Sequence, residues 1–241
     1  MRIAWVDNAK AIGLLLVLIA AVFPACCEVL LSDDFDDGNA DGWTELPSPG
    51  VSYTVEDGMY RLHGTWPDEI LAASLNGDEA GSMSTPDYST TVRVTAADGG
   101  FGLIARFSPF AFTGYVAYFD EVFNIVVIAR IDGPSSDPVP IGMMYCDIQP
   151  GTEYRVRFEA SGGLLGAKIW IGDPGDEPTN WLVMVDDSTY PQAGAMGLYA
   201  LDTNTGGTAS IDASFDDVVV TNDVTLGLEA GTWGGVKAGF R

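Results

Sequence analysis

Acidic residues gather near both ends of the chain, where their carboxylates could bind a hard cation. The first group is the run Asp33-Asp34-Phe35-Asp36-Asp37, and the second is Phe215-Asp216-Asp217. Calcium takes six to eight oxygen ligands, and two acidic strands lying side by side could supply several of them. The two groups therefore predict that the first and last strands of one domain pair and hold a structural Ca2+. Solvated charges at strand ends are the alternative.

Paired carboxylates for glycoside hydrolysis are harder to find in this sequence. Cleavage normally requires two carboxylates about 5–9 Å apart that flank the scissile bond. The adjacent pairs Asp120-Glu121 and Asp186-Asp187 would point to opposite faces if they lie in strands. The single histidine, His63, has no cysteine or second histidine nearby. The sequence therefore names no catalytic residue and leans towards a domain without enzymatic activity.

Aromatic residues cluster in one connection, where they could form a carbohydrate-binding surface. Phe110 and Phe112 lie in a segment bounded by proline and glycine, which makes them hard to bury in a core. Tyr115 and Tyr118 follow them, and Arg106 precedes them. We expect these five residues to contact a glycan. Packing of Tyr115 or Tyr118 in the core is the alternative.

A second candidate surface follows from strand geometry. If residues 161–164 form a turn, Arg155 pairs with Trp170 and Arg157 pairs with Lys168, all four on the charged face of a hairpin. An arginine over a tryptophan is a cation–π pair worth about 0.5–1 kcal/mol where it is exposed. We therefore predict that Trp170 and Arg155 form a second carbohydrate-binding patch. A solvated back face is the alternative.

Short alternating runs of residues must position these side chains. In residues 153–160 the even positions are apolar and the odd positions are charged, and residues 88–96 repeat the scheme, as expected of strands with one buried face. Residues 123–131 are apolar on nearly both faces, which predicts a central strand covered on its second side by a loop or a ligand. About thirteen such runs, with no long amphipathic helix, predict an all-β, two-sheet antiparallel sandwich over residues 29–221.

The N-terminal segment is typical of an export signal. Residues 11–23 are thirteen consecutive apolar residues behind Arg2 and Lys10. This run is too short to span a bilayer, which needs about 20 residues, but it suits the helical core of a signal peptide. We therefore predict a signal peptide over residues 1–26 and an extracellular, cell-surface or periplasmic protein. Cys26 follows a loosely lipobox-like sequence and is the candidate lipidation site, whereas a buried core helix is the alternative to export.

Charge and cysteine content narrow the range of partners. The formal net charge is −23, so the surface repels nucleic acid and anionic membranes. Membrane contact is therefore expected only through the leader or a lipid anchor. The chain has three cysteines, two of them at the leader boundary, which is too few for a disulfide framework. Cys146 is expected to be a small buried hydrophobic residue.

Residues 222–241 differ in composition from the rest of the chain. Trp233, Val236 and Phe240 have the spacing of one helical face, but the glycines at positions 231, 234, 235 and 239 disfavour a helix. We predict a C-terminal tail that acts as a sorting or docking peptide. A frayed terminus is the alternative.

The order of several short motifs resembles that of a known superfamily. The motifs are Asp33-Asp34-Phe35-Asp36-Asp37-Gly38, Gly42-Trp43-Thr44, Tyr53-Thr54-Val55-Glu56-Asp57-Gly58, Gly99-Gly100-Phe101-Gly102-Leu103, Pro150-Gly151-Thr152-Glu153-Tyr154, Gly194-Ala195-Met196-Gly197-Leu198-Tyr199 and Phe215-Asp216-Asp217-Val218. Together they resemble the concanavalin A-like lectin/glucanase superfamily, most closely the laminin-G-like and 3-keto-disaccharide-hydrolase-type domains of secreted bacterial proteins. The resemblance implies a jelly roll of two antiparallel sheets. It also implies structural calcium at positions matching Asp34 and Asp216, with Asp36 and Asp217 as alternates.

The superfamily includes glycan binding, glycoside cleavage and adhesion, so the fold does not settle the function. We favour an exported, non-catalytic carbohydrate-binding or adhesion module whose partner is a glycan or cell-surface polymer. A sugar hydrolase of the 3-keto-disaccharide type is the first alternative. A structural component of a cell-surface or extracellular assembly, addressed by the tail, is the second. The sequence specifies neither the ligand nor the oligomeric state.

Overall fold

Strands make up almost all of the regular structure in the computed structural model, which describes residues 27–77, 82–134, 137–203 and 207–226. The helical element that lies wholly within these ranges is a single 3-10 turn, Pro174–Asp176. The strands are β1 (Val29–Asp33), β2 (Thr44–Glu45), β3 (Val51–Glu56), β4 (Met59–Pro67), β5 (Ile70–Asn76), β6 (Tyr88–Asp98), β7 (Gly100–Ser108), β8 (Thr113–Asp120), β9 (Ile125–Asp132), β10 (Val139–Tyr145), β11 (Glu153–Ser161), β12 (Leu164–Trp170), β13 (Val183–Asp186), β14 (Ala195–Asp202) and β15 (Thr208–Thr221).

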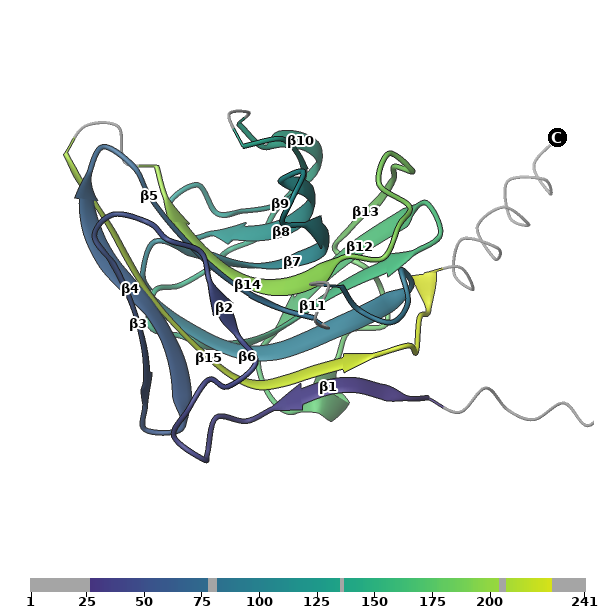
Figure 1. Cartoon of the computed structure of the whole chain (residues 1–241), viewed down its shortest axis with the longest axis horizontal. Helices are drawn as coiled ribbons and strands as arrows, with labels where there is room; N and C mark the ends of the chain where they lie inside the picture. The colour runs from purple at the N-terminus through teal and green to yellow at the C-terminus, as the bar shows by residue number, and fades with distance from the viewer. Residues whose placement is uncertain (1–26, 78–81, 135–136, 204–206, 227–241) are drawn as a thin grey trace, which may run out of the picture.

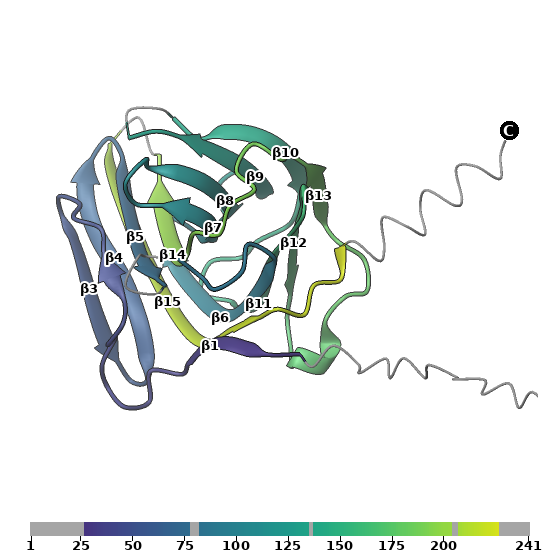
Figure 2. The ribbon, with the colours of Figure 1, turned by 45° about the vertical axis from the view of Figure 1, so that its right-hand side comes forward.

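The strands form two sheets in which every paired neighbour is antiparallel. The back sheet has the order β13-β12-β11-β6-β15-β4-β3, and β1 pairs with the second half of β15. The front sheet has the order β10-β9-β8-β7-β14-β5-β2. The back sheet wraps around the front sheet, as the turned view makes clear (Figures 1 and 2). The predicted two-sheet antiparallel sandwich is confirmed.

The first and last strands pair, as the sequence predicted. Ser32 lies opposite Val219, and Asp33 lies opposite Val218. Phe35 follows β1 into the core, where its ring lies 5.3 Å from that of Tyr60, and Tyr60 is the β4 partner of Phe215. The two ends of the domain therefore close around one aromatic cluster.

Alternation along the strands separates the core from the outer faces. In β11, Tyr154, Val156 and Phe158 are buried between the sheets, whereas Arg155 and Arg157 lie on the outer face of the back sheet with side chains only partly exposed. Burying an aromatic or branched side chain in this way contributes about 1.5–3 kcal/mol to stability. Many such positions on both sheets form one continuous core.

The front sheet has a second apolar layer on its outer face. In β9, Val126 and Ile128 face the core between the sheets, while Ala129 and Ile131 belong to a separate buried cluster. Phe112, in the turn between β7 and β8, packs against that second cluster. The second side of β9 is therefore buried beside a loop residue, as predicted, but β9 lies next to the edge strand β10 and not at the centre of its sheet.

Both ends of the described domain lie at the back sheet. The backbone N–H of Asn222 donates to the carbonyl of Glu28. The buried Glu159 carboxylate accepts hydrogen bonds from the backbone N–H groups of Thr225 and Leu226. The predicted signal peptide with Cys26, and tail residues 227–241, lie outside the described residues. The described ranges contain no helix with the length and hydropathy needed to span a membrane.

Candidate functional site

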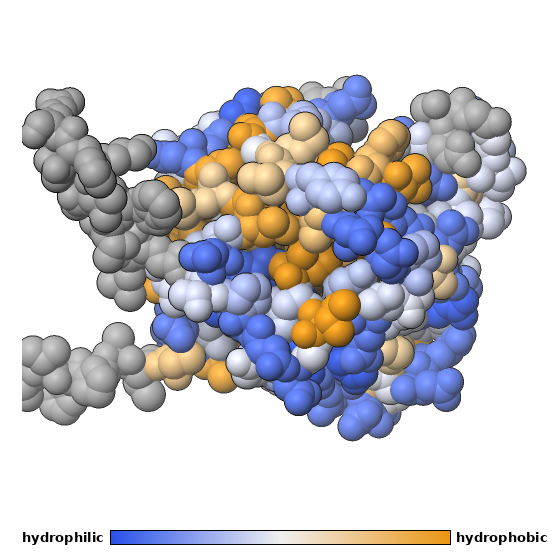
Figure 3. All heavy atoms as spheres, turned by 180° about the vertical axis from the view of Figure 1, so that it is seen from behind, coloured by the Kyte–Doolittle hydropathy of each residue, from blue (hydrophilic) through white to orange (hydrophobic). Residues whose placement is uncertain are grey.

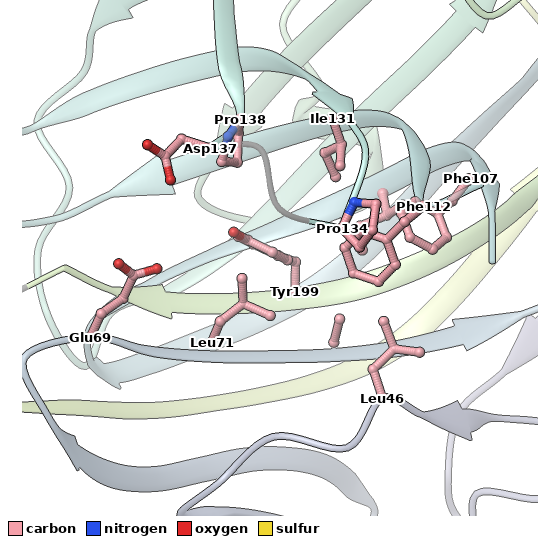
Figure 4. A pocket seen from close by; sticks show the side chains of 12 residues that line it. Leu46, Glu69, Leu71, Phe107, Phe112, Ile131, Pro134, Asp137, Pro138 and Tyr199 are labelled. Atoms are coloured by element: carbon pink, nitrogen blue, oxygen red, sulfur yellow. The ribbon is translucent and has the colours of Figure 1, made fainter. Parts of the chain in front are cut away.

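A cavity of about 420 Å3 opens on the outer face of the front sheet. Its lining comes from β5, β7, β9 and β14, from the connections between β4 and β5 and between β7 and β8, and from segments beside β2 and between β9 and β10. The lining residues are Leu46, Glu69, Leu71, Ala73, Ile104, Phe107, Phe112, Ile131, Pro134, Asp137, Pro138 and Tyr199 (Figure 4). Its volume lies within the range of small-molecule sites.

Apolar side chains build most of the cavity because alternating positions of neighbouring strands converge there. Ile104 of β7 and Tyr199 of β14 lie on the outer face of the front sheet. The ring of Phe112 meets that of Phe107 edge to face, with centroids 5.1 Å apart. The turn that carries Phe112 is held by a 2.8 Å hydrogen bond from its backbone N–H to the carbonyl of Ser108. The turn therefore fixes an aromatic wall beside the cavity.

One end of the cavity is polar. Figure 4 shows the phenol oxygen of Tyr199 pointing towards the side where Glu69 and Asp137 lie, with Leu46 and Phe112 away from it. Both carboxylate residues are exposed. Burial, and then the charge of Glu69, raises the pKa of Tyr199 above its usual range, so the phenol stays protonated and can donate a hydrogen bond. The cavity thus has an apolar wall and an acidic mouth.

The predicted aromatic residues occupy three different environments. Phe110 is 96% exposed in the same turn as the cavity residue Phe112. Tyr118 lies on the outer face, with its ring 5.9 Å from that of Tyr199 in an edge-to-face arrangement. Tyr115 is buried between the sheets, and its hydroxyl donates a 2.8 Å hydrogen bond to Asp187. Tyr115 therefore does not belong to a glycan-binding surface, because β8 turns it towards the core.

The prediction for Arg106 also needs correction. Its side chain is 0% exposed, and it donates hydrogen bonds to the carbonyls of Pro86 and Gly162 and to the carboxylate of Asp87. A register shift between β7 and β8 occurs at this point. The guanidinium therefore ties loops together inside the domain, where a glycan cannot reach it.

The predicted back-sheet pairs are present, but their aromatic partner differs. Arg155 lies opposite Trp170 and Arg157 lies opposite Lys168. Trp170, however, is only 7% exposed, and its indole N–H donates to the carbonyl of Asp173. The cation–π contacts that the structure shows lie at Trp181, 4.3 Å from Lys168 and 5.8 Å from Arg157. Trp181 stands outside the strands, so no alternation in the sequence pointed to it.

A groove of about 530 Å3 crosses this part of the back sheet. Its cations are already engaged: Arg155 pairs with Asp217 at 3.0 Å, and Arg157 pairs with Glu159 at 2.8 Å. Lys168 pairs with Glu177 at 3.0 Å. The groove is therefore a network of internal ion pairs, and it leaves Trp170 and Arg155 little free surface for a ligand.

The acidic residues predicted to bind calcium do not converge on a metal site. The Asp216 carboxylate pairs with Arg93, and Asp217 pairs with Arg93 and Arg155. Asp34 accepts a hydrogen bond from the backbone N–H of Asp36. Within the described ranges, no group of three or more His, Cys, Asp or Glu residues could hold a metal ion. Guanidinium groups occupy oxygens of Asp216 and Asp217 that a cation would need, so this pair does not fit the predicted Ca2+.

Sequence reasoning missed most of the residues that form the cavity. Leu46 and Glu69 lie beside short or exposed segments, and Asp137 precedes β10, so none of them carries a periodic signal. The outward position of Tyr199 could have been predicted from the sequence, since in β14 it alternates with the core residues Leu198 and Ala200. Their convergence depends on the strand order of the front sheet, which joins β5, β7 and β14.

Comparison with known proteins shows what this architecture resembles. No protein-family model matches the chain, and no curated protein matches it. Among solved structures, the carbohydrate-binding module CBM66 from Bacillus subtilis is 19% identical, with 76% of this chain and 96% of that chain covered and a TM-score of 0.53. The exoplasmic/lumenal domain of VIP36, in a form bound to Ca2+ and Man3GlcNAc, is 14% identical, with 77% and 88% covered and a TM-score of 0.54.

A third structure extends the comparison to an enzyme. SCLam, a non-specific endo-beta-1,3(4)-glucanase from family GH16, is 11% identical, with 82% of this chain and 92% of that chain covered and a TM-score of 0.56. At these identities the likeness concerns the fold. The protein has the concanavalin A-like jelly-roll fold of lectins and glucanases, as its sequence motifs predicted.

Proposed function

We propose that the protein is an exported, non-catalytic carbohydrate-binding module and that its ligand site is the front-sheet cavity with the adjoining turn of Phe110 and Phe112. The observation that carries the proposal is the 96% exposure of Phe110 beside a ready-formed cavity of about 420 Å3. An exposed aromatic ring offers the C–H face of a sugar an apolar platform, and aromatic side chains are common around ligand pockets. The carbohydrate-binding module and lectin among the similar structures support the same ligand class.

A glycan array with purified protein tests this proposal. We expect the wild type to bind a defined set of glycans, and we expect Phe110→Ala and Phe112→Ala to lose that binding. Ile171→Ala is the matched control, because Ile171 is also exposed, at 65%, but follows the back-sheet strand β12. Equal binding by the wild type, Phe110→Ala and Phe112→Ala would reject the front-sheet site, and no binding by the wild type would reject the function.

A glycoside hydrolase is the second candidate, and one observation favours it. Glu69 and Asp137 both line the cavity, and glycoside cleavage uses two carboxylates that face each other across the bond. Product release from disaccharides or β-glucans, abolished by Glu69→Gln and separately by Asp137→Asn, would establish catalysis. Unchanged substrate after prolonged incubation would leave the binding function as proposed.

The exported location also belongs to this proposal. It depends on the apolar run of residues 11–23 and on Cys26, which lie outside the described residues. Fractionation of cells that produce the full chain tests export, and a Cys26→Ala variant tests lipid attachment. The third predicted role, in a cell-surface assembly, depends on tail residues 227–241, and removal of that tail tests it by the oligomeric state.

A further inference from the structure

The hydrogen-bonding inventory of the front-sheet cavity restricts its ligand. Among the lining residues that the structure describes, Glu69, Asp137 and Tyr199 carry polar side chains and the others are apolar. An ionised carboxylate only accepts hydrogen bonds, and a phenol donates a single one. The side chains at this site therefore need a ligand that is rich in donors. Ammonium and hydroxyl groups satisfy that need, whereas a carboxylate or sulfate does not.

The cations of the described domain are committed elsewhere. They are Arg61, Arg93, Arg106, Arg130, Arg155, Arg157 and Lys168, and each forms an ion pair with a carboxylate of the protein. None of them lines the cavity. From the described residues, an anionic ligand would therefore meet two carboxylates and no compensating charge. The net charge of −23 adds a long-range field that attracts cations and repels anions.

The acidic character continues along the same face. A second depression of about 300 Å3 is lined by Asp98, Asp120 and Tyr118, among others. Tyr118 contacts Tyr199 edge to face, with ring centroids 5.9 Å apart, and Tyr199 lines the first cavity. The tyrosine pair thus lies between two depressions that both carry carboxylates. A chain-like ligand crossing this pair would meet acidic groups on each side.

We infer that the site selects polysaccharides whose units carry free amino groups, in preference to N-acetylated, neutral or acidic ones. The C–H faces of the sugars pack against the apolar wall at Phe112, and ammonium groups donate to Glu69 and Asp137. This inference rests on the proposed carbohydrate-binding function and adds the chemical class of the ligand.

Calorimetric titration with three tetrasaccharides tests the inference: tetraglucosamine, its fully N-acetylated form and tetragalacturonate. At pH 6 and low salt we expect tetraglucosamine to bind about tenfold or more tightly than the N-acetylated form, and tetragalacturonate not to bind. The preference should shrink at high salt, because screening weakens attraction between exposed charges. Equal affinity for the first two sugars, or tight binding of tetragalacturonate, would overturn the inference.

Variants separate specific recognition from general attraction to an acidic protein. Glu69→Gln and Asp137→Asn should each lower the affinity for tetraglucosamine several-fold and leave the affinity for the N-acetylated form unchanged. Asp57→Asn, in the exposed turn between β3 and β4 of the back sheet, removes the same charge and should change neither. Phe112→Ala keeps the charge but removes the wall, and it should lower both affinities. Equal effects of Asp57→Asn and Glu69→Gln would show non-specific attraction and overturn the inference.

The two proposals fail in distinguishable ways. If the wild type binds glycans on the array but does not prefer tetraglucosamine, the carbohydrate-binding function stands and the choice of amino sugars is wrong. If it binds no glycan on the array and none of the three tetrasaccharides, both proposals are wrong.

Discussion

The outer faces of the two sheets differ in what their side chains do. On the back sheet, Arg93, Arg155 and Arg157 pair with carboxylates of the same face, and the groove there is crossed by these contacts. On the front sheet, the cavity holds apolar side chains and two exposed carboxylates, with no cation among the lining residues that the structure places. The charged side chains of the back face therefore pair with one another, while the carboxylates that line the front-sheet cavity are available to a ligand.

The front sheet also exposes apolar side chains that do not line its cavity. Met143, Met144 and Tyr145 of the edge strand β10 are exposed, as are Val122 and Phe123 in the turn between β8 and β9. Figure 3 shows a hydrophobic patch surrounded by hydrophilic residues on the face seen from behind. The comparison teaches that charge count alone does not locate a site. What matters is which charges already have partners.

The largest expected effect is a loss of stability on substitution of Arg106, a front-sheet cation whose hydrogen bonds hold loops of the domain together. Arg106→Ala removes a fully buried guanidinium and leaves the carbonyls of Pro86 and Gly162 without their donor. An acceptor left in the interior without its donor costs about 1–3 kcal/mol, and the Asp87 carboxylate also loses its partner, so the urea midpoint should fall sharply. A variant with normal stability but lost glycan binding would instead make Arg106 part of the ligand site.

A smaller effect is expected at the exposed aromatic turn. Phe110→Ala should weaken glycan binding at least about tenfold, since truncating an aromatic at the centre of an interface costs about 2 kcal/mol. Its stability should stay within about 0.5 kcal/mol of the wild type, as for other exposed positions. Titration and thermal unfolding of the same preparation measure both quantities, and a stability loss in place of a binding loss would contradict the comparison.

A pH effect is expected where the two sheets meet at Asp187. Burial acts to raise the pKa of its carboxyl, but hydrogen bonds from Thr189, Tyr115 and Arg130 outweigh it and lower the pKa to about 2. A carboxyl with a lowered folded-state pKa stabilises the fold above the unfolded-state value of 3.8, and this contribution is lost as the pH falls towards 2. We expect it to be on the order of 1–2 kcal/mol.

Asp187→Asn should remove that part of the acid sensitivity, so that the stability difference from the wild type shrinks between pH 4 and pH 2, about the window of the lowered pKa. Denaturant titrations at several pH values measure the difference. A constant difference across this range would show that the Asp187 charge does not stabilise the junction of the sheets.

The smallest effect is expected on the back sheet. Arg155→Ala removes an ion pair with Asp217, whose side chain is 42% exposed, and exposed pairs contribute about 0–1 kcal/mol. Glycan affinity should not change, because the residue lies on the opposite outer face from the cavity. Loss of glycan binding in this variant would move the ligand site to the back sheet, as the sequence had first suggested for Arg155 and Trp170.

Alternation and strand-end signals carried most of the fold prediction. The hairpin register that pairs Arg155 with Trp170 and Arg157 with Lys168 is confirmed, because a turn position and a period of two fix the pairing. The site prediction was less complete. The alternation of side chains along a strand separates its two faces but does not show which face packs against the other sheet. Tyr115 was therefore grouped with Phe110, although it points into the core.

The sequence by itself determined the alternating strands, since these depend on local periodicity and turn chemistry. Its two acidic terminal segments predicted the pairing of the chain ends, and the resemblance of its motifs to a known superfamily implied the jelly roll. Only the tertiary structure decided which charges neutralise each other and which residues share a cavity. Arg93 reaches Asp216 across neighbouring strands, and Glu69, Asp137 and Tyr199 come from three distant parts of the chain. Contacts between such distant residues depend on strand order and side-chain direction, neither of which is a local property of the chain.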